Sequence, residues 1–338
     1  MASLIKLLAR RHFYPNLVKT GISKSIANFS KHQFLILNYH GVIDKVDFNY
    51  SINHMDAEQF EHQIKFLSKN FNILPQDEFL YNYLNNKTSN KKSILLTFDD
   101  GYENNFKFAF PLLKKYNTPA TIFLISSLID SKNPTWYDLI DNTSSLFNNE
   151  KHRDKIGKLC TELGINSQKE ILHNSLKKYL KTQSTHKKNE ILEKYLSIIG
   201  DKSMDNIDEK YWKILSSDQI IKMQQSGIIS FGSHTVTHPN LDQINKDDVE
   251  LELKDSKSKI ENILGKKIKT IAFPDGAYNE NVKIMSKEAG YTNLFAVNYR
   301  CESDKNDNSI LNRYSISNTT TAESVITNIC LAFQKQGF

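Results

Sequence analysis

Strand-like apolar runs that alternate with amphipathic helical patterns limit the folds open to this chain. The helical patterns, with apolar residues three and four positions apart, lie between most of the runs. Such alternation favours parallel strands with helices packed against them. The sequence therefore predicts an α/β fold built as a parallel barrel. The apolar runs cover residues 34–39, 93–98, 120–125, 228–232, 269–273 and 294–297.

Helix start and stop signals support this interpretation. Asp56 is a predicted N-cap for a helix that buries Phe60 and Ile64. Residues 102–116 have a second helical pattern. Asn245 is a predicted cap for a third helix, which Gly265 ends.

The run 93–98 ends in two adjacent carboxylates, Asp99 and Asp100, followed by Gly101. Adjacent like charges repel and shift each other's pKa, so they are tolerated where a cation or a proton lies between them. A metal ion is the simplest candidate.

Two histidines, His234 and His238, lie four positions apart after the run 228–232. A turn of helix, or a tight loop that ends at Pro239, would direct both rings to one point. Two imidazoles and one carboxylate make an open three-ligand site with a fourth position for water. Zinc fits this donor set best, with cobalt, nickel or iron as alternatives.

Three polar segments each follow a predicted strand. They are Asp99-Asp100, Ser233-His234 and Pro274-Asp275. In parallel barrels the chemistry collects at the carboxyl ends of the strands. We therefore expect these segments to converge on one face.

Both motifs together resemble the polysaccharide deacetylase family, the NodB-like carbohydrate esterases. A T-F-D-D-G motif is met at residues 97–101, and H-[ST]-x-x-H is met at His234, Thr235 and His238. The resemblance covers roughly residues 34–318. It implies an irregular (β/α) barrel of seven or eight strands. It also implies an activity that removes N-acetyl groups from amino sugars.

The resemblance also implies roles for single residues. Asp99 would be the catalytic base, and Asp100, His234 and His238 would hold the metal. The family's R-x-P-x-G motif appears at residues 272–276 without its arginine.

The late L-x-H motif of the family has Arg313 where the histidine belongs, and no histidine follows His238. We expect His40, at the end of the first strand, to serve as the general acid. Arg313 is expected to orient Asp99 or to bind an anionic substrate.

Five residues beside these motifs are predicted substrate contacts. The two tyrosines each adjoin a motif glycine and would stack on a sugar ring. The five are Tyr102, Pro274, Asp275, Gly276 and Tyr278.

Residues 136–212 interrupt the alternation of strand and helix. They are rich in Lys, Asn, Glu and Leu and carry short amphipathic helical patterns. We interpret them as a helical insertion in a barrel that spans 34–338. The insertion would cap the cleft, bind a partner or form a decorative layer.

Residues 1–33 form a basic amphipathic N-terminal segment. This pattern suits a helix in an anionic membrane interface, or a helix that packs on the domain. The segment lacks the uninterrupted apolar region and cleavage site of a secretion signal. We expect a cytoplasmic protein, with peripheral contact to the inner face of the membrane as a further expectation.

The formal net charge of +6 is spread over many lysines, without a nucleic-acid motif. This balance is compatible with anionic lipids or phosphorylated carriers, or with a solvated surface. The three cysteines are widely separated and odd in number, so they indicate no disulfide framework or cysteine metal site.

The sequence predicts a metal-dependent hydrolase. It would remove N-acetyl groups from N-acetylhexosamine units of a cell-envelope polysaccharide or of a lipid-linked glycan precursor. One alternative is a glycan-binding protein that has lost turnover, because the third-motif arginine and late histidine are missing. Another is an O-acetyl esterase or other amide hydrolase on the same scaffold.

Overall fold

Parallel strands form the centre of the molecule. The computed structural model describes residues 14–47, 50, 53–165, 172–205, 207–316 and 321–335. The strands of the main sheet are β1 (Phe34–Tyr39), β5 (Ser93–Phe98), β6 (Ala120–Leu124), β7 (Ile229–Ser233), β8 (Thr270–Ala272), β9 (Asn293–Ala296), β10 (Ile310–Asn312) and β11 (Tyr314–Ser315). They pair in the order β10-β9-β8-β7-β6-β5-β1-β11, and these pairings are parallel.

One extended segment closes this sheet into a barrel. It consists of β10 and β11, which are separated only by Arg313. β10 pairs with β9, whereas β11 pairs with β1 at the other end of the order. The backbone N–H of Arg313 donates to the Ala296 carbonyl at 3.0 Å, and that of Ile316 donates to Asn38 at 2.8 Å. Arg313 therefore lies at the seam of the barrel.

Short strands outside this ring were not predicted from the sequence. β4 (Asn72–Ile73) pairs with the start of β5. β2 (Gly41–Ile43) and β3 (His54–Asp56) form a separate two-stranded sheet. The predicted runs 34–39 and 93–98 coincide with β1 and β5 residue for residue, and the other four predicted runs lie within one or two residues of β6 to β9. The predicted barrel is confirmed.

Side chains from alternate positions of the strands fill the inside of the barrel. Their neighbours along each strand belong to the larger core that also contains the outer helices. This alternation follows from the two-residue period of a strand. The inner cluster contains Ile36, Leu95, Phe123, Ala272, Phe295 and Leu311.

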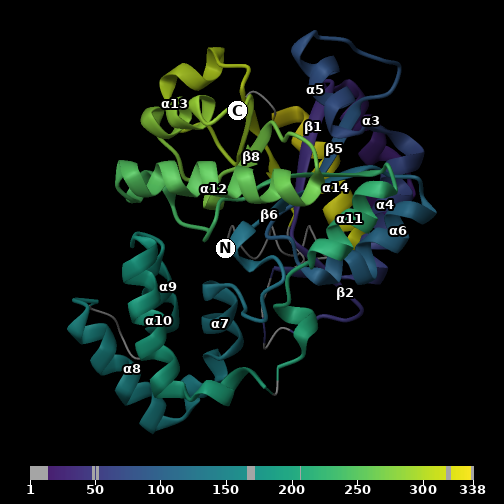
Figure 1. Cartoon of the computed structure of the whole chain (residues 1–338). Helices are drawn as coiled ribbons and strands as arrows, with labels where there is room; N and C mark the ends of the chain where they lie inside the picture. The colour runs from purple at the N-terminus through teal and green to yellow at the C-terminus, as the bar shows by residue number, and fades with distance from the viewer. Residues whose placement is uncertain are drawn as a thin grey trace.

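Helices cover the outside of the barrel (Figure 1). They are α4 (Ala57–Asn70), α5 (Gln76–Leu84), α6 (Phe110–Lys115), α11 (Ser217–Gln225), α12 (Lys246–Leu264), α13 (Glu280–Glu288) and α14 (Ala322–Lys335), and a π-helical turn (Asn105–Ala109) precedes α6. Asn245 caps α12 by accepting from the Asp248 N–H at 2.9 Å. Gly265 ends the helix in the left-handed conformation with φ 62°. Both predictions for this helix are confirmed.

The N-terminal segment contributes two short helices, α2 (Tyr14–Lys19) and α3 (Ile22–Phe29), which contact α14. Ser23 on α3 is buried, and its hydroxyl lies 2.9 Å from the Thr327 hydroxyl. Residues 1–13 lie outside the described part of the chain. Within the described residues, none of the helices combines the length and the apolar character needed to cross a membrane.

The insertion between β6 and β7 is helical. It contains α7 (Trp136–Asn142), α8 (Glu150–Glu162), α9 (Leu172–Leu180) and α10 (Thr185–Ile199), with short 3₁₀ turns at Ser144–Asn148, Asp201–Met204 and Glu209–Tyr211. Figure 1 shows these helices as a teal lobe below α12. The lobe has its own core, in which Ile156, Leu176 and Tyr195 are buried.

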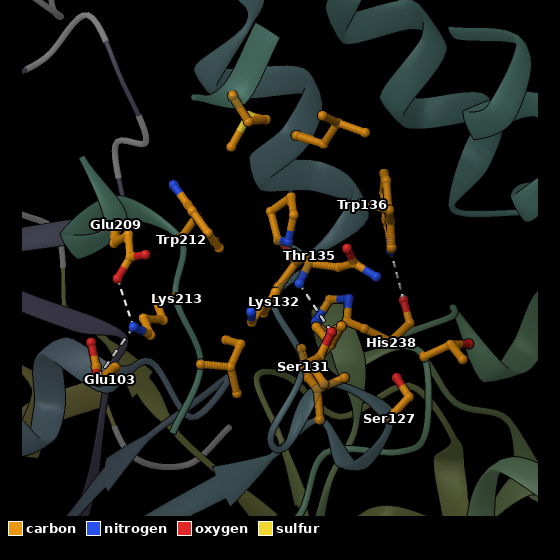
Figure 2. Close-up of a pocket in the computed structure, with 18 of the residues that line it drawn as sticks. Glu103, Ser127, Ser131, Lys132, Thr135, Trp136, Glu209, Trp212, Lys213 and His238 are labelled. Atoms are coloured by element: carbon orange, nitrogen blue, oxygen red, sulfur yellow. Dashed lines mark hydrogen bonds and ion pairs between the residues drawn. The ribbon is translucent and has the colours of Figure 1, made fainter. Parts of the chain in front are cut away.

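A pocket of about 1020 Å³ lies between the insertion and the barrel (Figure 2). Its walls come from the segment before α7, from α10 and from residues 204–219. The insertion therefore meets the barrel only partly, and it leaves a space beside the carboxyl ends of the strands.

Candidate active site

The turn after β5 presents both carboxylates at the carboxyl end of the barrel. Asp100 has φ 72° and Gly101 has φ 76°, so two consecutive residues adopt the left-handed conformation. The φ of 76° favours glycine at position 101, and a Cβ there would also lie 2.7 Å from Cδ2 of Leu124. The tight turn leaves Asp99 and Asp100 adjacent, and both line one small pocket.

A loop, and not a turn of helix, carries the two histidines. β7 ends at Ser233, and Thr235 and His238 have φ 67° and 59°. Glu252 on α12 holds the loop by accepting from the backbone N–H groups of Val236 at 2.7 Å and Thr237 at 2.9 Å. This contact makes a strained loop rigid, which favours a fixed geometry of the two rings.

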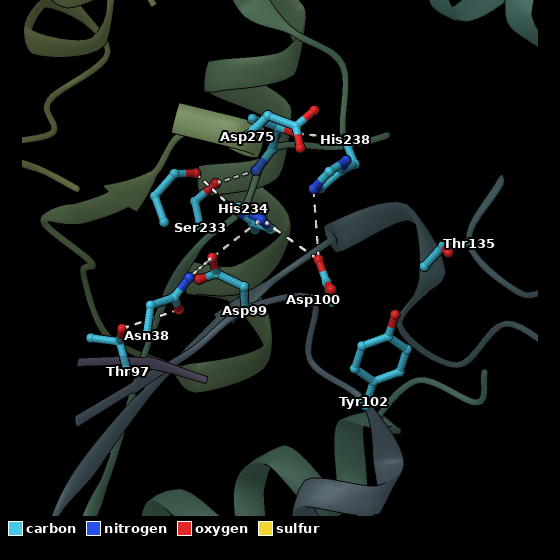
Figure 3. A network of polar contacts seen from close by, with 12 residues as sticks. Asn38, Thr97, Asp99, Asp100, Tyr102, Thr135, Ser233, His234, His238 and Asp275 are labelled. Atoms are coloured by element: carbon cyan, nitrogen blue, oxygen red, sulfur yellow. Dashed lines mark hydrogen bonds and ion pairs between the residues drawn. The ribbon is translucent and has the colours of Figure 1, made fainter. Parts of the chain in front are cut away.

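Asp100, His234 and His238 converge on one point (Figure 3). The Oδ1 atom of Asp100 lies 3.6 Å from Nε2 of His234 and 3.7 Å from Nε2 of His238. Nδ1 of His234 lies 2.7 Å from the Ala272 carbonyl and donates to it, so Nε2 is left to face the cluster. One ligand atom from each of the three residues lies within 4.8 Å of the others.

These residues fit a divalent metal ion. The separations of 3.6 and 3.7 Å exceed a hydrogen bond, so each nitrogen faces the carboxylate across a gap. Burial raises the pKa of Asp100 to about 6, and burial lowers the pKa of His238 well below its usual value. A cation among them would offset the cost of the buried carboxylate and would favour neutral imidazole ligands.

Asp99 forms a bidentate ion pair with Arg313. The guanidinium nitrogens Nη1 and Nη2 lie 2.6 and 2.8 Å from the two carboxylate oxygens. Nδ2 of Asn38 donates to the same carboxylate at 3.0 Å. Burial alone would raise the pKa of Asp99, but the charges of Arg313 and His234 hold this pKa well below its usual range. Asp99 is therefore an ionised, fixed carboxylate.

Arg313 supplies the cation that the third motif lacks. Residue 272, where the family pattern has arginine, is an alanine. Its carbonyl accepts a hydrogen bond from Nδ1 of His234. Arg313 comes from the barrel seam, and its side chain is almost fully buried. Of the two expected roles for Arg313, the structure places it against Asp99.

Asp99 and Asp100 line a pocket of about 390 Å³, which we call the mouth of the site. His40 lines it, and burial lowers the pKa of this histidine. Asp275 and Gly276 line it as well, and Asp275 forms an ion pair with Lys181 at 2.7 Å.

The insertion contributes three further side chains to the mouth. Tyr137 comes from α7, Lys177 from α9 and Lys181 from the residues that follow α9. The Tyr137 ring lies 4.9 Å from that of His238. The insertion thus takes part in the site, which agrees with the cleft-capping alternative.

Three predicted substrate contacts do not line the mouth. Tyr102 is fully buried and donates to Asp138 at 2.8 Å, and Figure 3 shows its ring on the side of Thr135. Tyr278 is 1% exposed and donates to Asp304 at 2.6 Å. Pro274 is also buried. The predicted sugar stacking by both tyrosines is not supported, because neither ring reaches solvent.

Sequence reasoning missed Asn38, Glu252 and the residues of the insertion at the mouth. Asn38 is the polar residue in an otherwise apolar strand, which is a signal that could have found it. Glu252 lies on the buried face of α12 among apolar residues, which is a similar signal. Lys177 and Lys181 carry no such mark, because they are two of many lysines.

Comparisons with known proteins agree with this geometry. The family model for polysaccharide deacetylase matches residues 86–164 and 172–294, which is more than half of the chain. Among solved structures, the Streptococcus pyogenes deacetylase PplD in complex with acetate has a TM-score of 0.55 at 21% identity, covering 88% of this chain and 97% of that one. The polysaccharide deacetylase BC0361 of Bacillus cereus has a TM-score of 0.56 at 23% identity, covering 89% and 70%. These structures share the fold.

Curated relatives match over parts of their length. YxkH of Bacillus subtilis (strain 168), whose name assigns it provisionally to the polysaccharide deacetylases, is 24% identical over 69% of this chain and 55% of its own. A Staphylococcus aureus (strain MSSA476) poly-beta-1,6-N-acetyl-D-glucosamine N-deacetylase is 35% identical over 33% of this chain and 42% of its own. The chain thus spans about half the length of these relatives. On the extent of the family match, the chain belongs to the polysaccharide deacetylase family.

Proposed function

We propose that this protein is a metal-dependent hydrolase that removes the N-acetyl group from N-acetylhexosamine units of a cell-envelope glycan or of its lipid-linked precursor. The observation that carries the proposal is the buried triad Asp100, His234 and His238 beside the Asp99–Arg313 pair. The name of the Staphylococcus aureus relative supports the choice of bond.

Asp100, His234 and His238 would hold the metal, and zinc is the first candidate for this donor set. A divalent metal bound there lowers the pKa of a water molecule and polarises an acyl oxygen. The three residues fix the place of this chemistry at the floor of the mouth, next to Asp99.

Asp99 acts as the general base. Its Oδ2 atom is 3.9 Å from Nε2 of His234, so the carboxylate faces the triad. Arg313 keeps it ionised, and both Arg313 and Asn38 fix its orientation. An ionised and oriented carboxylate can accept the proton of an attacking water.

His40 acts as the general acid that protonates the leaving amine. It lines the mouth together with Asp99 and Arg313. Burial lowers the pKa of His40, which favours the neutral ring, so His40 would first take up a proton and would then donate it readily to the amine. With the proton delivered to the nitrogen, the products are acetate and a free amino sugar.

The ion pair between Asp99 and Arg313 favours an active hydrolase over a glycan-binding protein without turnover. A buried ion pair is costly to desolvate, and a binding protein without chemistry has no use for an oriented base. The arginine that contacts Asp99 comes from the barrel seam and not from the third motif. The missing third-motif arginine therefore does not indicate lost activity.

Product analysis tests this proposal. The purified protein is offered soluble and lipid-linked N-acetylhexosamine substrates together with O-acetylated sugars, and acetate and free amine are measured separately. Asp99→Asn is the matched control. We expect equal amounts of acetate and amine from the wild type and none from the variant. Acetate without amine would identify an O-acetyl esterase instead, and release of neither would contradict the proposal.

We further propose a cytoplasmic location with contact to the inner face of the membrane. On α3, Ile22 is 46% and Phe29 is 87% exposed. Lys24 of α3 and Lys19 at the end of α2 are exposed as well. Apolar and basic residues together favour an anionic lipid surface. We expect the full chain to sediment with anionic vesicles, and Phe29→Ser to weaken this binding. Equal sedimentation of both proteins, or none with the wild type, would contradict the proposal.

A further inference from the structure

The pocket between the insertion and the barrel is the larger of the two spaces around the site. Its volume is about 1020 Å³, compared with about 390 Å³ for the mouth. His238 lines both spaces. A ligand that occupies the large pocket therefore lies directly beside the proposed metal triad.

Lys188 lies in this pocket without a polar partner. The residue is 1% exposed, and within the described residues its Nζ atom has no hydrogen-bond partner. It lies on the buried face of α10, in line with Ile191, Tyr195 and Ile199. The ammonium group lies over the Trp136 ring, 4.9 Å from its centroid, and among the described residues it has no hydrogen-bond partner. Burying an ammonium group without a hydrogen bond is costly, so this position favours an anion.

The two carboxylates whose charge raises the pKa of Lys188 are engaged elsewhere. Glu252 and Asp275 are the acidic groups whose charge acts on Lys188. Glu252 accepts from the backbone N–H groups of the histidine loop, and Asp275 pairs with Lys181. The described ion pairs include none to Lys188. Among the described residues, the charge of Lys188 is therefore not neutralised by an ion pair.

Aromatic and apolar side chains form the part of the wall around Lys188, and polar and charged residues, among them Glu103, Lys132, Glu209 and Lys213, line the rest. The Trp136 ring lies 4.9 Å from Nζ of Lys188, and Figure 2 shows the Trp136 and Trp212 side chains on opposite sides of the pocket. Indole rings suit the apolar faces of sugar rings. Among the other lining residues are Leu192, Leu196, Met204 and Ile207.

We propose that this pocket is a second substrate subsite, in which Lys188 binds the carboxylate or phosphate of an acidic sugar residue next to the acetylated one. The inference rests on the proposed function, because it assigns the substrate of the same site. A charge-assisted hydrogen bond in a buried position is stronger than one between neutral groups, so an acidic glycan is favoured over a neutral one. Trp136 and Trp212 would contact the ring of this residue.

Intrinsic tryptophan fluorescence gives a direct readout. The chain has two tryptophans, and both line this pocket. The wild type is titrated with a neutral N-acetylglucosamine oligosaccharide, with one that carries a uronate and with one that carries a phosphate. We expect both acidic ligands to change the fluorescence and to bind about tenfold tighter than the neutral one. The tighter of the two identifies the source of the anion.

Three variants on α10 complete the test. Lys188→Met should lose the preference for acidic ligands, and Lys188→Arg should retain it. Lys187→Met is the matched control, since Lys187 is exposed and paired with Glu190 at 2.9 Å. Equal affinity for neutral and acidic ligands in the wild type, or an unchanged preference in Lys188→Met, would overturn the inference.

Binding and turnover are measured separately, so the two proposals fail in different ways. If acidic ligands bind through Lys188 and no acetylated sugar is hydrolysed, the proposed function is wrong and the pocket assignment stands. Suppose instead that the wild type and Lys188→Met deacetylate neutral glycans with the same KM, and that the wild type does not prefer acidic glycans over neutral ones. In that case the proposed function stands and the subsite assignment is wrong.

Discussion

Replacing Arg313 with methionine removes the cation that pairs with Asp99 and keeps a side chain of similar length in the barrel seam. Both partners are buried, with side-chain exposures of 1% and 5%. Breaking a buried pair by removing one partner costs about 3–5 kcal/mol, because the other charge is left uncompensated. We expect this loss in the free energy of unfolding, measured with urea.

The same change should abolish the proposed base. Burial alone would raise the pKa of Asp99, so removing Arg313 shifts this pKa upward and also removes two of the hydrogen bonds that orient the carboxylate. Loss of general-base catalysis lowers turnover by about 10²–10⁴-fold. We expect a fall in kcat of this size for acetate release by Arg313→Met, with the zinc stoichiometry unchanged.

A double-mutant cycle with Asp99→Asn separates this reasoning from a general effect on folding. The double variant has no uncompensated charge, so it should regain part of the stability that Arg313→Met loses. Its residual activity should equal that of Asp99→Asn, since Arg313 acts through Asp99. Additive losses of activity, or full activity in Arg313→Met, would refute this account of the pair.

Two further predictions concern single residues. His40→Gln should lower kcat for N-acetyl substrates by at least about 100-fold, and the loss should shrink for an activated acetyl ester, whose leaving group needs no proton; an equal loss on both would contradict the assignment as acid. Burial lowers the pKa of Lys188 from 10.5 to about 8, so the unliganded fold carries a cost of about 3 kcal/mol at pH 7. Lys188→Met should therefore be the more stable protein by urea denaturation at pH 7. Between about pH 8 and 10.5 the unfolded wild type binds more protons than the folded protein does, so its free energy of unfolding rises with pH. The difference in stability between the wild type and Lys188→Met should therefore shrink over this range. A difference that is constant with pH would contradict the prediction.

Much of the barrel could be predicted because β1, β5 and β6 are apolar runs of five or six residues and helical patterns lie between most of the strands. β1 and β5 coincide with the predicted runs. The closing segment could not be predicted, since β10 and β11 have three and two residues and are interrupted by a charged side chain. Only the tertiary fold shows that Arg313 lies between β9 and β1.

The candidate site, like the barrel, could be predicted only in part from the sequence. Asp100, His234 and His238 could be grouped because each follows a strand and the carboxyl ends of parallel strands meet. Tyr102 was misjudged because its position beside Gly101 does not reveal its direction: the left-handed turn carries the ring inward to Asp138.

The burial of Lys188 on α10 could have been predicted from the sequence. Lys188 is three, seven and eleven positions from Ile191, Tyr195 and Ile199, which places it on the apolar face of the helix. A lysine on such a face is either paired or functional. That it has no hydrogen-bond partner among the described residues, in contrast, is visible only once the insertion is placed against the barrel.

Metal removal and replacement test the central claim most directly. The protein is stripped with a chelator, its metal content is measured, and zinc or cobalt is added back while acetate and amine release are followed, with Asp100→Asn beside it. We predict that the stripped wild type is inactive and regains activity in proportion to about one bound ion per chain, whereas Asp100→Asn neither binds the ion tightly nor regains activity. Full deacetylase activity in protein shown to be free of metal would contradict the account.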